Sequence, residues 1–119
     1  MTDSASASII DPRMIATTVD LPGFRLVRGL GIAYGIGLRY EPWRFGARSA
    51  PDSDQATLVR IAVDAREAAL AMLARHAATK GANAVVDLRF AISEFSENEE
   101  LKTYEVLAYG TAVVAEPAG

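Results

Sequence analysis

The chain has 119 residues, a net charge of −3 and a sequence pI near 5.1, and it contains no cysteine. Its acidic balance excludes a general attraction to nucleic acid or anionic lipid. The lack of cysteine excludes disulfides, thiolate metal sites and cysteine nucleophiles. No leader segment or membrane-length apolar run is visible, so we expect a cytoplasmic protein without a membrane partner. We expect a flexible tail over residues 1–13, a single domain over 14–115 and a second tail over 116–119.

The first expected elements are strands. A short β-prone run at 14–19 ends at the turn signal Asp20-Leu21-Pro22-Gly23. The following run, 24–40, alternates in the manner of a strand but contains four glycines. Glycines inside a strand pattern predict bulges or close backbone contacts, and not one straight strand.

A long helix is expected next, from about Asp54 to Lys80. Apolar residues recur there at spacings of three and four, and a second apolar row lies beside the first. Gly81 stands where a left-handed residue would end the helix. One small sheet cannot cover so wide an apolar surface, which favours burial against a neighbouring subunit.

Two further strands are expected after the helix. Residues 84–93 alternate cleanly, residues 96–100 form an acidic turn, and the run 102–114 is apolar on both faces. The order ββαββ predicts an α+β fold, a two-layer sandwich of one antiparallel sheet and one long helix.

Three stretches are together specific enough to compare with known families. They are Thr17-Thr18 with Gly23 and Gly31-Ile32-Ala33-Tyr34-Gly35; Ala65-Arg66-Glu67-Ala68-Ala69-Leu70 with Lys80-Gly81-Ala82-Asn83-Ala84-Val85-Val86; and Gly110-Thr111-Ala112-Val113. Their order and spacing over residues 14–114 resemble the YbjQ family, small bacterial proteins labelled as heavy-metal-binding domains of unknown function.

The resemblance implies a two-layer subunit that assembles into a ring-shaped homopentamer, with no established reaction. The chain departs from the family in the loop before the helix, where Gly46-Ala47-Arg48-Ser49 replaces a Gly-Gly-Arg-Ser element. The resemblance marks eight structural positions: Thr17, Thr18, Gly23, Gly31, Gly35, Gly81, Gly110 and Thr111.

His76 is the candidate metal ligand. It is the only histidine and the only strong ligand for a borderline or soft metal in the chain. One histidine cannot hold a divalent transition metal within a monomer, although a symmetric ring could gather five copies. The alternative is a packed or capping histidine whose charge suits the last helical turn. No other cofactor is evident.

A second candidate site is the aromatic and basic segment Tyr40, Trp43, Arg44, Phe45 and Arg48. Interleaved cations and aromatics are typical of single-stranded nucleic-acid binders. The whole chain is acidic, however, so nucleic acid is disfavoured. Contact with the acidic stretch 87–105 of a neighbouring subunit is the favoured interpretation.

No nucleophile, base and orienting group can be assembled from the sequence, so we expect a protein that is not an enzyme. The leading hypothesis is a homo-oligomer, with a pentamer favoured, that binds an unknown small ligand or a metal at subunit interfaces. The alternatives are a scaffold without ligand, or an enzyme whose site combines Arg44 and Arg48 with an acidic strand of the neighbour.

Overall fold

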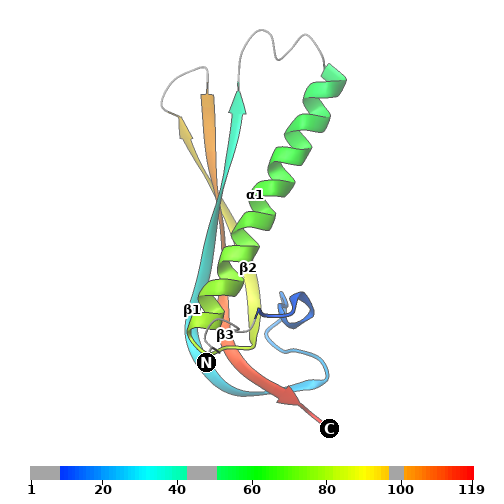
Figure 1. The fold of residues 1–119 in the computed structure, drawn as a ribbon, viewed down its shortest axis with the longest axis vertical. Coiled ribbons are helices and arrows are strands. Elements are labelled where there is room, and N and C mark those ends of the chain that lie inside the picture. The colour runs from blue at the N-terminus through cyan, green and yellow to red at the C-terminus, as the bar shows by residue number, and fades with distance from the viewer. Residues whose placement is uncertain (1–8, 43–50, 97–100) are drawn as a thin grey trace, which may run out of the picture.

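The computed structural model describes residues 9–42, 51–96 and 101–119. The elements in chain order are a 3-10 helix η2 (Pro12–Met14), β1 (Phe24–Pro42), α1 (Pro51–Thr79), β2 (Ala84–Ser96) and β3 (Leu101–Pro117). The three strands form one antiparallel sheet in the order β1-β3-β2, and α1 packs on one side of it (Figure 1). The predicted α+β fold with one helix on an antiparallel sheet is confirmed.

The short β-prone run at 14–19 forms only an isolated bridge. Ile15 pairs with Val85 in parallel, and the Ala16 amide donates to the Val85 carbonyl at 2.9 Å. The Leu88 amide in turn donates to the Ala16 carbonyl at 3.0 Å. A 3-10 turn precedes this segment and a turn follows it, so few of its residues can run alongside β2.

β1 is bulged where its glycines begin. Its register with β3 shifts between Leu26 and Arg28 and again between Gly29 and Ile32. Gly31 lies inside the second shift with a φ of +95°, a conformation that glycine adopts without steric cost. The predicted bulges in this strand are confirmed.

The helix begins at Pro51, three residues before its predicted start, and proline suits the first position of a helix. Its end is the predicted left-handed glycine, since Gly81 has a φ of +90°. The Gly81 amide donates to the Ala78 carbonyl at 2.9 Å and the Ala82 amide to the Ala77 carbonyl at 3.1 Å, which closes the last turn. Among the described residues, no helix is long and apolar enough to cross a membrane.

The molecule is elongated, with extents of 57 × 32 × 21 Å. Its radius of gyration is 17.7 Å, whereas a compact domain of this length would have about 13.5 Å. α1 packs on the sheet along its C-terminal half and diverges from it along its N-terminal half (Figure 1). Leu58, Val59 and Val63 on that diverging half, the upper helix row, are exposed. The prediction that one sheet cannot cover the helix is confirmed.

Asp87 adopts a strained conformation beside the register shift in β2. Among the described residues other than glycine it alone has a positive φ, 58°, and its carboxylate pairs with Arg89 at 3.0 Å on the surface. We expect Asp87→Val to lower the free energy of unfolding by about 1–2 kcal/mol, because a β-branched residue fits this region poorly. Asp87→Gly should change it little, since an exposed ion pair stabilises weakly. Urea unfolding of both variants measures the two free energies. An equal loss in both variants would contradict a strained backbone at Asp87.

Candidate functional site

The contact between α1 and β1 is built on glycine. Gly35 and Gly37 are buried against the helix. A Cβ at Gly35 would overlap the Ala69 carbonyl and the Leu73 amide, and a Cβ at Gly37 would overlap the Ala65 carbonyl. The helix therefore approaches β1 at backbone distance, and the predicted close backbone contacts are confirmed.

This close approach lets two helix side chains reach the free edge of β1. Because β1 is an edge strand, some of its amides point away from β3. The Tyr34 amide donates to His76 Nδ1 at 3.0 Å, and the Ile36 amide donates to Met72 Sδ at 3.4 Å. The His76 and Tyr34 rings also pack together, with centroids 4.5 Å apart. His76 thus occupies the last turn of α1 as a packed residue that joins helix and strand.

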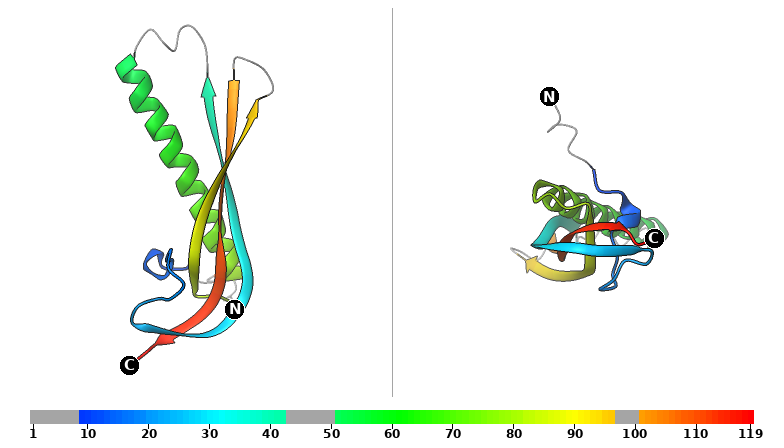
Figure 2. Two further views of the ribbon diagram at one scale, coloured as in Figure 1. Left: turned by 180° about the vertical axis from the view of Figure 1, so that it is seen from behind. Right: turned by 90° about the horizontal axis from the view of Figure 1, so that it is seen from below.

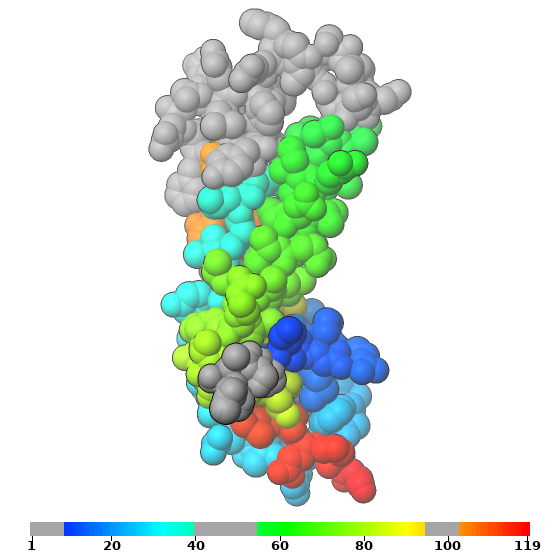
Figure 3. All heavy atoms as spheres, in the orientation of Figure 1, coloured from blue at the N-terminus to red at the C-terminus, as the bar shows by residue number. Residues whose placement is uncertain are grey.

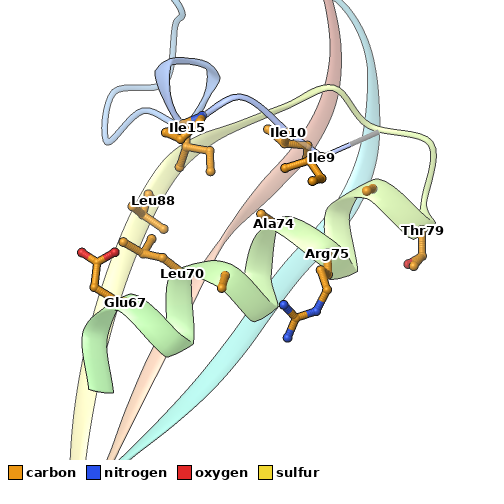
Figure 4. A pocket seen from close by; sticks show the side chains of 12 residues that line it. Ile9, Ile10, Ile15, Glu67, Leu70, Ala74, Arg75, Thr79 and Leu88 are labelled. Atoms are coloured by element: carbon orange, nitrogen blue, oxygen red, sulfur yellow. The ribbon is translucent and has the colours of Figure 1, made fainter. Parts of the chain in front are cut away.

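An apolar groove lies on the other flank of α1, between the helix and the segment that precedes β1 (Figure 4). Its volume is about 710 Å³, within the range of small-molecule sites. Most of its lining is aliphatic: Ile9, Ile10, Pro12, Ile15, Leu70, Ala71, Ala74, Ala78 and Leu88, with Glu67, Arg75 and Thr79 as the polar members.

The charged groups stand at the margins of the groove. Glu67 places its carboxylate at the end near Leu88, whereas the Arg75 guanidinium turns away from the isoleucines (Figure 4). Beyond Ile10, hydrogen bonds from Arg13 lower the pKa of Asp11 below its ordinary value, and Asp11 caps η2. The groove itself therefore offers apolar contact and few polar partners.

The aromatic and basic segment predicted as a second site falls almost wholly outside the described residues. Trp43, Arg44, Phe45 and Arg48 lie there. Tyr40 is part of β1, where its backbone pairs with Thr103 of β3. The role of these five side chains therefore stays a prediction.

The eight motif positions set the course of the chain. Three glycines have positive φ values: Gly23 at 84°, Gly31 at 95° and Gly81 at 90°. Gly110 is buried where a Cβ would lie 2.8 Å from Val85 Cγ1. The Thr18 carbonyl accepts a hydrogen bond from the Asp87 amide at 2.8 Å, while Thr17 and Thr111 are exposed. None of the eight lines the groove.

Two residues with a role in the core or in the contact between α1 and β1 were not identified from the sequence. Ile10 is buried in the core although it precedes the predicted domain. Met72 belongs to the apolar series of the helix, yet its sulfur accepts an edge amide of β1. The four-residue interval between Met72 and His76 was the available signal, because it places both side chains on one helix face.

One helix on an antiparallel sheet, with a glycine-lined contact between them, defines a class of small α+β domains. A crystal structure of a DUF74 family protein of unknown function from Pediococcus pentosaceus shares this fold. The TM-score is 0.53 at 14% sequence identity, and the match covers 86% of this chain and 96% of that chain. At this identity the likeness concerns the fold alone.

Residues 13–116 match the YbjQ family, described as "Putative heavy-metal-binding", and the chain belongs to this family. A UPF0145 protein of Picrophilus torridus is 34% identical over 112 residues, covering 91% of this chain and 92% of the relative. A UPF0145 protein of Thermococcus kodakarensis is 38% identical over 109 residues, covering 87% and 91%. The predicted family is confirmed, but its predicted restriction to bacteria is too narrow, because these two relatives are archaeal. Neither name states a reaction.

The family description raises the question of which residues would hold a metal. Soft metals favour thiolate and imidazole ligands, and the chain offers no cysteine and one histidine. Among the residues that the structure describes, no three His, Asp or Glu side chains converge on a point. Within one chain, the described residues therefore do not supply the donor set of a heavy-metal centre.

Proposed function

We propose that this protein is the subunit of a homo-oligomer, a pentamer in keeping with its family resemblance, and that the assembly binds a small ligand. The observation that carries this proposal is an apolar row on the uncovered face of the sheet. Alternate residues of β1 lie opposite the buried Gly35 and Gly37 and remain exposed, although the Tyr34 ring also packs against His76 at the edge of the strand: Ile32 (65%), Tyr34 (50%), Ile36 (37%) and Leu38 (50%). Seen from behind, α1 lies on the far side of the sheet and does not cover this face (Figure 2). We call these four residues the β1 outer row.

Two distinct faces are available if the subunits close into a ring, which would avoid aggregates of unlimited size. One is the β1 outer row, and the other is the upper helix row on the N-terminal half of α1. Atoms of α1 form part of the front surface in Figure 3. A contact between unlike faces generates a closed ring when the rotation between subunits divides a full turn. The predicted subunit contact of Tyr40, Trp43, Arg44, Phe45 and Arg48 remains part of this proposal, although most of that segment lies outside the described residues. We propose neither a nucleic-acid partner nor a reaction.

Light scattering across a dilution series tests the assembly. At micromolar concentration we expect a mass several times the 12.7 kDa of one chain, independent of dilution over a tenfold range. A mass of one chain throughout would contradict the proposal.

The apolar groove favours a small apolar molecule as the ligand. We expect Ala71→Trp to abolish binding of 1-anilinonaphthalene-8-sulfonate, because an indole at Ala71 would occupy the groove. Ala56→Trp is the matched control, since Ala56 is exposed on the same helix outside the groove. The measurement is the fluorescence titration of both variants beside the wild type. Equal binding by all three would place the probe elsewhere and contradict a groove site.

A further inference from the structure

The His76 imidazole and the Met72 thioether form a matched pair of acceptors for the edge of β1. Their positions on α1 differ by four residues, a rise of about 6.0 Å. The amides that they accept, from Tyr34 and Ile36, differ by two residues of strand, about 6.7 Å. The two intervals nearly coincide, so one helix face can satisfy successive outward amides of the strand.

This pairing depends on the glycine contact beneath it. Gly35 lies between the two amides and meets the helix backbone between Ala69 and Leu73. Met72 Cβ already lies 2.9 Å from the Cβ position of Gly35. A larger residue there would push the helix away from the strand and lengthen both hydrogen bonds. The pairing ends after Met72, because the next residue on that face, Ala68, has no side-chain acceptor.

The hydrogen bond from the Tyr34 amide determines which nitrogen of the His76 ring carries the proton. A backbone amide can only donate, so Nδ1 is the acceptor and carries no proton. In the neutral imidazole the single proton then resides on Nε2. A metal ion coordinates through a nitrogen lone pair, and the ring has no second one. Coordination at either nitrogen would require the bond to Tyr34 to be given up or the Nε2 proton to be removed.

We propose that His76 is a latch that closes the edge of β1 onto α1, and that it is not a metal ligand in the folded protein. The latch satisfies an amide that would otherwise be open to water or to another strand, which is the general hazard of an edge strand. This assignment runs against the heavy-metal description of the family. It does not depend on the proposed assembly, because both partners of the latch belong to one subunit.

Nuclear magnetic resonance of the full-length ¹⁵N-labelled protein tests the latch. We expect the His76 ring to show an unprotonated Nδ1 and a protonated Nε2. His76→Ala should speed hydrogen exchange of the Tyr34 amide on the order of tenfold, the loss of roughly one hydrogen bond. Met72→Leu is the matched control, and it should speed exchange at Ile36 while leaving Tyr34 unchanged. Protonation at Nδ1, or unchanged Tyr34 exchange in His76→Ala, would overturn the latch.

The metal half of the proposal uses Zn²⁺ as the probe on the same labelled protein. We expect additions up to several equivalents per subunit to leave the His76 nitrogen resonances and the Tyr34 amide in place. Changes in both that saturate at a fixed ratio of Zn²⁺ to subunit would show coordination and overturn the proposal. Light scattering of the same samples tests the proposed assembly separately. A failure to assemble would show there as the mass of one chain and would leave the His76 resonances unchanged.

Discussion

Replacing Gly35 or Gly37 by alanine is expected to disrupt the contact between α1 and β1 more than any other single methyl group added to the described glycines. The new Cβ would overlap helix backbone atoms, which cannot rotate away as the tip of a side chain can. We expect the free energy of unfolding to fall by about 3 kcal/mol, the upper part of the usual range for overpacking. Urea unfolding followed by circular dichroism measures the loss at one fixed protein concentration.

Gly29→Ala is the matched control for this prediction. Gly29 lies in the same strand, but a Cβ there meets nothing within 4 Å and its φ is not positive. We therefore expect Gly29→Ala to unfold at nearly the wild-type urea concentration. If alanine at Gly29 and alanine at Gly35 lowered the free energy of unfolding equally, the loss would come from any side chain in this strand. The close approach of the helix would then not explain it.

The second large effect is expected on assembly. Ile32→Asp places a carboxylate in the β1 outer row, where a subunit contact would have to bury it without a partner. An unpaired buried charge costs several kcal/mol, so we expect association to weaken at least about 100-fold. Sedimentation velocity at micromolar concentration should then show the variant as single chains.

Val19→Asp is the matched control for the assembly. Val19 and Ile32 are both 65% exposed, but Val19 lies in the segment before β1 and outside the row. We expect Val19→Asp to sediment as the wild type does. Dissociation by both substitutions would point to a general effect of charge, and dissociation by neither would place the interface on another face.

Much of the fold could be predicted from the sequence because the relevant signals are local. The three- and four-residue spacing of apolar side chains predicted α1, and Gly81 predicted its end. The glycines predicted that β1 would be bulged. The segment around Ile10 was harder, because a single buried side chain outside any periodic run leaves no pattern to detect.

The orientation of β1 illustrates what side-chain patterns omit. Alternation separates a large row, with Ile32 and Ile36, from a small row with Gly35 and Gly37, and burial of the larger row would be the ordinary outcome. The structure packs the small row on the helix instead. Because glycine has no side chain, the backbones of α1 and β1 come close together, and His76 reaches the Tyr34 amide at the edge of the strand. Periodicity records the volumes of side chains, whereas this contact depends on the distance between backbones.

The candidate sites also depend on residues that are far apart in the chain. His76 stood out as the only histidine, but its chemistry depends on the Tyr34 amide, which lies 42 positions away in the chain. The groove beside α1 is lined by residues that precede β1 in the chain and by residues that follow it, and no short sequence motif marks the groove. The functional inferences therefore come from three-dimensional neighbours and not from spacing along the sequence.

Native mass spectrometry of the wild-type protein tests the central claim most directly, because it counts subunits. We predict a dominant species of five times the 12.7 kDa chain mass, sprayed from micromolar solution. A single species with another number of subunits would support assembly but contradict the pentamer. A spectrum of single chains alone would contradict the account, since the β1 outer row and the upper helix row would then have no partner.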